Sequence, residues 1–402
     1  MNGVPRRFAA SALGYFSLRD LIPMFAVYSL LFAAHGLTTA QISSLFVIWS
    51  VTSFTFEVPS GAWADTVSRR GLLGLSSLLY AAGFLLWTVA PSYAGFAAGF
   101  VLWGVSSALM SGTFEALLYD ELGVLGATDA YPRLMGFANS LAMGCNLVAT
   151  LAAAPLLVLG GYVLVGWVSV GVVLVQGVLV WSLPAAPRLT PAQAEEAPEG
   201  SFARRYVATL VAGLTEVHRR RVVGRGVLLS AVMYGVTAFD EFFPLLGLDK
   251  GADPGEIPLL IGMTVLGQMA GTALAGRTAR MPGSTMAGLL GLAAALLVVG
   301  ALIDQPLAFV SIGLGYGIVS NGIVVAEARL QDVIEGGARA TVTSVAGLLS
   351  EVFAVVVFGL FALGTTSLSV PVTLGMLFAI LFGVAIATPQ WLPPTPSRGD
   401  RL

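Results

Sequence analysis

The sequence predicts an all-α integral membrane protein with twelve transmembrane helices, arranged as two six-helix bundles related by pseudo-two-fold symmetry. Of its 402 residues, 56% are hydrophobic and only 10% are charged, whereas a soluble domain carries about 25% charged residues. Apolar runs of about 20 residues, long enough to cross a bilayer, recur along the whole chain. These runs are continuous rather than alternating, which argues against an outer-membrane barrel.

Clusters of glycine, proline and charged residues divide the apolar runs into two sets of six. The first set covers roughly residues 10–34, 40–62, 71–90, 93–118, 132–158 and 161–183. The second set covers roughly 224–247, 257–277, 284–303, 306–328, 341–363 and 368–391. We therefore predict an N-terminal bundle over 1–183, a cytoplasmic linker over 184–221, and a C-terminal bundle with a short cytoplasmic tail over 222–402.

The predicted linker has two parts. Its first part is rich in Pro, Ala and Glu and is typical of irregular chain. Its second part places apolar residues along one helical stripe with arginines at both ends: Phe202, Tyr206, Leu210, Leu214 and Val217. This pattern fits an amphipathic helix lying on the inner leaflet, and it fits a solvated connector equally well.

The distribution of basic residues predicts the orientation. When both termini are placed in the cytoplasm, all of the 20 Lys and Arg residues fall on the inner side except Arg19 and Lys250. Loops rich in Lys and Arg stay on the cytoplasmic side of a membrane. We therefore expect a multi-pass protein of the cell (cytoplasmic) membrane with the N and C termini inside.

Seven acidic residues fall within the predicted spans, with Arg19 as their one basic companion away from the span edges. They are Asp20, Glu57, Glu115, Asp240, Glu241, Glu327 and Glu351. A charge at the bilayer centre costs about 2.5–3.5 kcal/mol, so such residues normally face a cavity or pair with one another. Burial favours the neutral form of a carboxyl group, and an acid that takes up and releases protons can couple transport to them.

Depth along each span separates the charged residues into two groups. Arg19 and Glu351 each follow an inner-side arginine by twelve residues, about 18 Å along a helix, which places them near mid-membrane. With Asp20, Asp240 and Glu241 they are predicted to form a substrate and proton cavity. Arg19 and Asp20 could equally form a structural pair, and Asp240 or Glu241 could be a buried acid neutralised by Arg19 or by a tyrosine hydroxyl.

Polar and aromatic residues within the spans are further candidates for the cavity lining. They are Tyr28, Asn139, Asn146, Gln268 and Asn321. Each has an alternative role, because hydrogen bonds between membrane helices use the same residue types. The segment GQMAG, residues 267–271, has the small-residue spacing of a close helix contact rather than of a site.

The sequence contains no pattern typical of an enzyme, and we expect no enzymatic activity. Lys250 is not preceded by the glycine spacing of a phosphate-binding loop, and there is no HExxH segment. Two histidines and one cysteine cannot build a usual zinc site, so no metal or cofactor is expected. The net charge of −2 offers no basic face for nucleic acid.

The loop between the second and third predicted spans reads EVPSGAWADTVSRRGLL, residues 57–73. It resembles the signature loop of the major facilitator superfamily, with Gly61, Asp65, Arg69, Arg70 and Gly71 matching position by position. SGTFEALLYDEL (111–122), FDEFFPL (239–245) and ARATVTS (338–344) are similar to bacterial members grouped with drug-efflux proteins. The resemblance does not extend to the fifth span, where Ala154 precedes Pro155 in place of the glycine usual in proton-coupled drug antiporters.

The resemblance implies a cytoplasmic gate and a transport function. Gly61, Asp65, Arg69 and Arg70 belong to the gate, with Asp120 as their partner; Glu57, Glu115 and Arg339 lie near the same inner end. We expect a secondary transporter that works by alternating access and exports a small, partly hydrophobic compound by proton antiport. The alternatives are a metabolite uptake carrier or uniporter, or a non-transporting receptor or scaffold. The expected partners are this compound, protons and the lipid bilayer, and the protein is expected to be a monomer.

Overall fold

The computed structural model describes residues 4–184, 211, 213–334 and 339–395; for residues 58, 61, 62, 64–66 and 340 it describes the backbone alone. Every element of regular structure in these ranges is helical, which confirms the predicted class. Eleven of the described helices are long and apolar enough to cross a membrane. The predicted linker, with Phe202, Tyr206 and Leu210, falls almost wholly outside the described residues.

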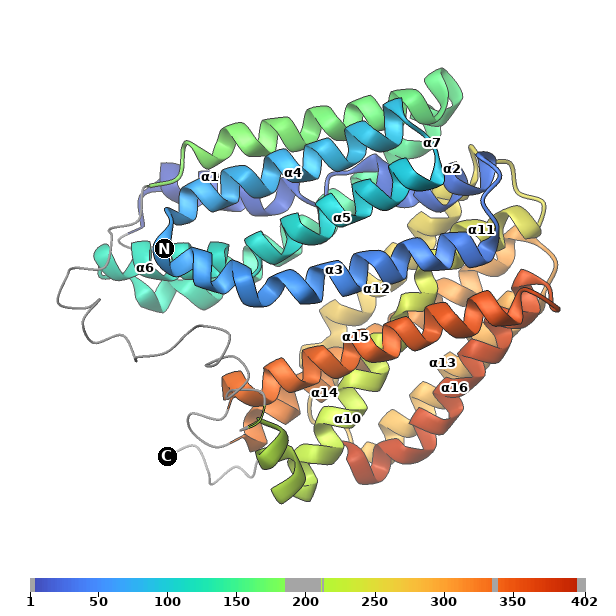
Figure 1. Ribbon diagram of the computed structural model, residues 1–402. Helices are drawn as coiled ribbons and strands as arrows, with labels where there is room; N and C mark the ends of the chain where they lie inside the picture. Colours follow the sequence, from blue (N-terminus) through green and yellow to red (C-terminus); the bar gives the residue numbers. More distant parts are fainter. Residues whose placement is uncertain (1–3, 185–210, 212, 335–338, 396–402) are drawn as a thin grey trace. The chain divides into compact units, whose positions relative to one another are not determined.

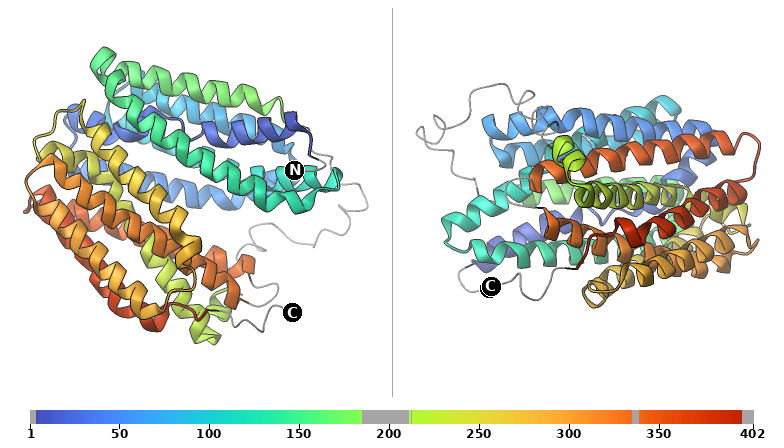
Figure 2. Two further views of the ribbon diagram at one scale, coloured as in Figure 1. Left: turned by 180° about the vertical axis from the view of Figure 1, so that it is seen from behind. Right: turned by 90° about the horizontal axis from the view of Figure 1, so that it is seen from below.

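The difference between twelve predicted spans and eleven helices arises in α7 (Tyr131–Val180). The apolar segment that contains it, Thr128–Val180, has 53 residues and would be about 80 Å long as one straight helix. A hydrocarbon core is about 30 Å thick. At Gly160 and Gly161 the backbone leaves the helical region, with φ of 62° at Gly161, and the chain reverses direction there (Figure 2). The two arms of α7 correspond to two predicted spans.

The chain divides into two compact units, residues 1–35 with 45–206 and residues 36–44 with 207–402. Within each unit the helices lie side by side (Figure 1). The helices from the N-terminus to α7 are α1 (Arg6–Leu18), η1 (Pro23–Ala26), α2 (Tyr28–Ala34), α3 (Thr39–Thr66), α4 (Arg69–Val89), α5 (Tyr93–Met110), α6 (Thr113–Val124) and η2 (Thr128–Ala130). The predicted domain bounds stay a prediction.

The helices of the second unit follow the linker. They are α10 (Arg221–Val236), η3 (Thr237–Phe242), α11 (Phe243–Asp249), α12 (Ile257–Thr278), α13 (Gly283–Leu302), η4 (Pro306–Ala308), α14 (Phe309–Val333), α15 (Arg339–Gly364) and α16 (Val370–Trp391).

The first span of each half is broken at a proline. Residues 19–23 read RDLIP and residues 240–244 read DEFFP, so each proline follows two charged and two apolar residues. Proline cannot donate the hydrogen bond that continues an α-helix, and it pushes the preceding residue toward extended backbone. Ile22 is extended, with φ −111° and ψ 102°, while residues Thr237–Phe242 form a 3-10 helix. Each break therefore carries a pair of ionisable residues within the first span of its half.

The second arm of α7 supplies partners for backbone groups near the first break. Ser169 Oγ accepts a hydrogen bond from the Met24 amide at 3.1 Å, and Gln176 Nε2 donates to the Tyr15 carbonyl at 3.2 Å. Both side chains are buried. Backbone that leaves the helix inside a membrane must find such partners, because no water reaches it.

Glycines bring α12 and α14 into close contact in the second unit. A Cβ atom on Gly267 would lie 2.0 Å from the Gly313 carbonyl oxygen, and one on Gly271 would lie 1.9 Å from that of Gly317. The predicted helix contact at GQMAG is therefore confirmed. Asn321 adds to it, since its Nδ2 donates to the Gly271 carbonyl at 2.9 Å.

Lys250, the basic residue predicted on the outer side, caps the C-terminal end of helix α13. Its buried ammonium group donates to the carbonyls of Ala301, at 2.8 Å, and Ile303. A cation stabilises the negative end of a helix dipole. Burial lowers the pKa of Lys250, whereas Asp304 and Asp249 act in the opposite direction.

Candidate functional site

A cavity of about 410 Å³ lies inside the first unit, where the breaks in two spans meet. We call it the N-terminal cavity. It is lined by Phe16, Arg19, Asp20, Phe25, Trp49, Ser53, Ser76, Tyr80, Trp103, Ser106, Ser107, Met110, Ser111, Gly112, Phe114, Glu115 and Gln176. One of these breaks is at residues 19–22, and the other lies between α5 and α6, where Gly112 has a φ of 69° and precedes the first residue of α6. Irregular backbone at membrane depth is tolerated where it lines a cavity.

One wall of the N-terminal cavity is charged and another is aromatic. Arg19 Nε lies 3.7 Å from Asp20 Oδ1, and both side chains are partly exposed. The ring of Trp103 forms the centre of the aromatic wall, stacked on Phe25 at 5.2 Å between centroids and tilted against Tyr80 at 5.7 Å. The structure thus brings the predicted pair Arg19–Asp20 next to rings that the sequence did not single out.

Serines and buried polar atoms complete this cavity. Ser76 and Ser106 donate to each other's carbonyl oxygens, at 2.9 and 2.8 Å, and so join α4 to α5. Trp49 Nε1 and Gln176 Oε1 are buried without a hydrogen-bond partner among the described residues. A polar atom left unsatisfied inside a protein is costly, which suits a cavity whose occupant supplies the missing bonds.

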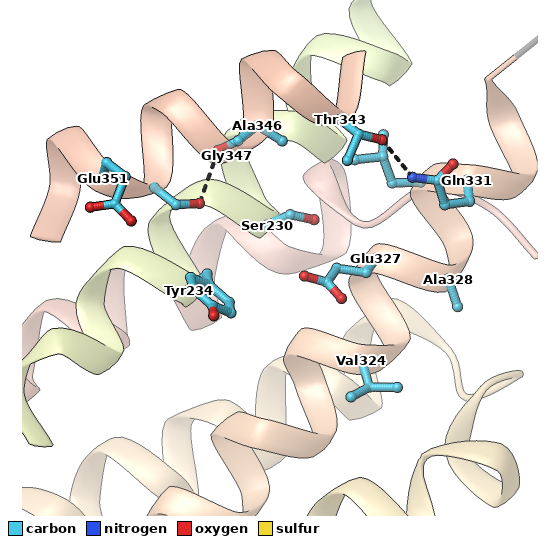
Figure 3. A pocket seen from close by; sticks show the side chains of 12 residues that line it. Ser230, Tyr234, Val324, Glu327, Ala328, Gln331, Thr343, Ala346, Gly347 and Glu351 are labelled. Carbon is cyan, nitrogen blue, oxygen red and sulfur yellow. Dashed lines mark hydrogen bonds between the residues drawn. The ribbon is translucent and has the colours of Figure 1, made fainter. Parts of the chain in front are cut away.

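A second cavity, of about 640 Å³, lies inside the second unit between α10, α14 and α15 (Figure 3). We call it the C-terminal cavity. It is lined by Ser230, Tyr234, Val324, Glu327, Ala328, Leu330, Gln331, Thr343, Ala346, Gly347, Ser350 and Glu351. Glu351 was predicted as a proton site, and Glu327 was one of the seven acids predicted to fall within the spans; the structure places both on the same lining. Gln331 Nε2, on α14, donates to Thr343 Oγ1, on α15, at 3.0 Å.

Asp240 and Glu241 lie outside both of these cavities, at the break in the first span of the second half. Tyr316, on α14, donates its hydroxyl to Asp240 Oδ2 at 2.6 Å. This is the tyrosine partner that the sequence left open as an alternative. Glu241 is half-buried beside it on η3. The role of either acid in proton transfer stays a prediction.

The predicted gate residues lie at the start of α4 and on α6. Arg69 forms an ion pair with Asp120, and Ser68 caps α4 by accepting from the Gly71 amide at 3.3 Å. Arg70 donates to the Leu183 carbonyl at 3.3 Å and lies over the Trp181 ring, which ties the start of α4 to the end of α7.

The other predicted gate residues are not gathered around that ion pair. Glu57 and Arg339 are exposed, and Glu115 lines the N-terminal cavity. The structure describes only the backbone at Gly61 and Asp65. Their role in a gate stays a prediction.

The polar residues predicted along the path are dispersed. Tyr28 is buried among Phe32, Phe46, Trp87 and Phe100. Asn139 is exposed, while Asn146 and Gln268 are half-buried; none of these four lines either cavity. The amide of Asn321 takes part in the contact of α12 with α14 through both of its polar atoms, because its Oδ1 also accepts from Thr278 Oγ1 at 3.0 Å.

Several lining residues were missed from the sequence. Ser230, Tyr234 and Thr343 carry no pattern that separates them from ordinary polar residues in a span. The repeat RDLIP and DEFFP was a usable signal, since it marks both breaks at the same spacing from a proline. This spacing alone identifies Asp240–Glu241 as the positions in the second half that are equivalent to Arg19–Asp20 in the first half.

Comparison with known proteins identifies the fold. The family model described as Major Facilitator Superfamily matches residues 8–358. A nucleoside transporter, NupG, is similar with a TM-score of 0.70 at 8% identity over 96% of both chains. A D-xylose–proton symporter has a TM-score of 0.69 at 15% identity over 98% of both chains. A bacterial homologue of the human lysosomal transporter Spinster has a TM-score of 0.66 at 15% identity, over 96% of this chain and 94% of that one. No curated protein sequence matches the chain.

Proposed function

The chain belongs to the major facilitator superfamily and is a multi-pass membrane transporter rather than an enzyme; from this premise we propose that it exports a small, partly hydrophobic compound in exchange for protons. Export proceeds by alternating access, with both termini in the cytoplasm. Protons are taken up and released by carboxyl groups that lie within the spans. Arg69, Asp120 and the loop before them act as the cytoplasmic gate.

One observation carries this proposal: each unit contains a cavity that lies between its helices and has carboxyl groups on its lining. An ionised acid in a membrane is costly, and a protein that only needed to fold would place apolar residues there. The N-terminal cavity joins charge to an aromatic wall, which suits a compound with both polar and apolar parts.

The structural neighbours do not choose among substrates. Their identities of 8% and 15% show a shared fold, and one fold serves many functions. Export is preferred over uptake because of the resemblance of FDEFFPL and SGTFEALLYDEL to efflux members, and uptake is the competing outcome of the test below.

The test uses purified protein in liposomes that enclose a pH indicator. After a pH step across the membrane, a panel of labelled compounds is offered and both proton and compound fluxes are measured. We expect at least one compound to move against the proton flow. Among Asp240→Asn, Glu241→Gln and Glu351→Gln, at least one should abolish coupled flux while expression is kept. Glu256→Gln, an exposed loop residue before α12, is the matched control.

The outcomes separate the alternatives. Flux in the same direction as protons would identify an uptake symporter, and flux without protons a uniporter. Normal coupling in all three acid variants would show that the proton sites lie elsewhere. No gradient-driven flux with any compound would favour a receptor or scaffold.

A further inference from the structure

The C-terminal cavity is acidic and contains no basic lining residue. Glu327 and Glu351 are its two ionisable acids among the twelve residues that line it, and none of the twelve is Arg, Lys or His. Arg329 lies two residues beyond Glu327 in the chain, but it is buried and its guanidinium donates to the carbonyls of Ala279, Met281 and Pro393. Its guanidinium is therefore used at the ends of neighbouring helices and is not part of the cavity lining.

A buried hydroxyl faces the same space as the acids. Ser230 is 4% exposed, and its Oγ has no hydrogen-bond partner among the described residues. Figure 3 shows Ser230 and Tyr234 projecting from α10 and Glu327 pointing toward them from α14. A hydroxyl buried without a hydrogen bond is unfavourable, so an occupant that bonds to it would gain that interaction.

The size of the cavity indicates what kind of cation it suits. Its volume of about 640 Å³ lies in the range of small-molecule pockets and far exceeds the space of one metal ion. The described residues contain no group of three or more metal-ligating side chains. Val324, Ala328, Ala346 and Gly347 supply apolar walls, and the Tyr234 ring can contact a cation over its face.

We propose that the C-terminal cavity binds the protonated amine of a small organic cation with an apolar body. Glu327 and Glu351 bind the positively charged ammonium group, and Ser230 Oγ accepts a hydrogen bond from one of its N–H groups. The apolar walls enclose the apolar body of the cation. In naming a substrate class, this inference rests on the proposed transport function. The binding of the cation itself does not depend on transport.

The N-terminal cavity is a poorer site for such a cation. Arg19 lies on its lining, 3.7 Å from Asp20, and a guanidinium repels an incoming ammonium group. The two linings thus differ in formal charge: the C-terminal lining carries two acids and no basic residue, whereas the N-terminal lining carries Arg19 besides Asp20 and Glu115. This difference supplies an internal comparison for the experiment.

The test measures binding to the purified full chain in detergent, by calorimetry and without any gradient. The probes are 2-phenylethylamine and its neutral match, 2-phenylethanol. We expect the amine to bind and the alcohol to bind at least tenfold more weakly. Glu327→Gln and Glu351→Gln should each weaken amine binding at least tenfold, Ser230→Ala should weaken it several-fold, and Glu256→Gln should leave it unchanged.

A second pair of variants keeps both acids and so tests the site without disturbing charge. Cβ atoms on Gly347 and Gly359, both on α15, would have no heavy atom within 4 Å, and only Gly347 lines the cavity. Gly347→Leu should fill the cavity and block the amine, whereas Gly359→Leu should not. Equal binding of amine and alcohol, or unchanged amine binding in Gly347→Leu or in both acid variants, would overturn the proposal.

Two outcomes distinguish this inference from the transport proposal. If Glu115→Gln, on the N-terminal cavity, abolishes amine binding while Glu327→Gln and Glu351→Gln keep it, the amine site is elsewhere and the inference fails, even when transport is intact. If the amine binds as expected but the liposomes show no gradient-driven flux, the binding site stands and the transport proposal fails.

Discussion

The first spans of the two halves are broken in the same way but neutralise their charges differently. RDLIP and DEFFP both place two ionisable residues four and three positions before a proline. In the first half the acid has a basic neighbour in the same segment, since Arg19 lies 3.7 Å from Asp20. In the second half Asp240 is bound instead by the hydroxyl of Tyr316, at 2.6 Å and from another helix.

The same contrast holds for the cavities. The N-terminal cavity carries Arg19 together with Asp20 and Glu115, and the C-terminal cavity carries Glu327 and Glu351 with no basic lining residue. A break made by proline is a local property, and each half repeats it. The groups that interact with these charged residues come from the surrounding residues and helices, and these groups differ between the two halves. That divergence is the basis of the cation site proposed for the C-terminal cavity.

The largest expected effect concerns how closely the helices pack against one another within each half. Gly271→Ala places a Cβ atom 1.9 Å from a backbone oxygen, whereas Gly83→Ala in the first half places one at 2.9 Å. Overpacking costs about 1–3 kcal/mol, so we expect Gly271→Ala to lose about 3 kcal/mol and most of its folded yield, and Gly83→Ala about 1 kcal/mol. Gly276→Ala, on the same helix as Gly271 with no atom near its Cβ, is the control in thermal unfolding. Equal losses at 271 and 276 would contradict the close contact.

The second effect concerns the acid at the second break. Tyr316→Phe removes the hydroxyl that donates to Asp240 and should lower the free energy of unfolding by about 2 kcal/mol, as for hydrogen bonds to charged groups. Tyr119→Phe, an exposed tyrosine, should change it by less than about 0.5 kcal/mol. In a double-mutant cycle Asp240→Asn should reduce the cost of Tyr316→Phe. Strict additivity would show that the two groups do not interact.

The smallest effect concerns the pair at the first break. Arg19→Ala leaves Asp20 without its neighbour, but both side chains are partly exposed, so we expect a loss of only about 1 kcal/mol. The same change removes the one basic residue from the lining of the N-terminal cavity and leaves Asp20 and Glu115. This cavity should then acquire affinity for 2-phenylethylamine in a Glu327→Gln background. Absence of any new binding would mean that charge alone does not decide which cavity accepts a cation.

Much of the fold could be predicted because it follows from the solvent. The apolar runs, the two sets of spans and the glycine contact at 267–271 depend on local composition and spacing. The count of helices differed only where Gly160 and Gly161 join two spans with no polar loop between them. The site was less predictable: Arg19–Asp20 and Glu351 do line cavities, but Tyr28 packs among aromatic rings and Asn321 is used between α12 and α14.

The sequence by itself determined that this chain crosses a membrane many times, that its family is that of facilitator transporters, and where its ionisable residues enter the spans. These follow from the cost of exposing polar groups to lipid, which acts on each segment separately. Only the tertiary structure decided that Glu327 and Glu351 share one cavity and that Tyr316 reaches Asp240. Such pairings depend on which helices are neighbours and which way each side chain points, and a segment does not carry that information alone.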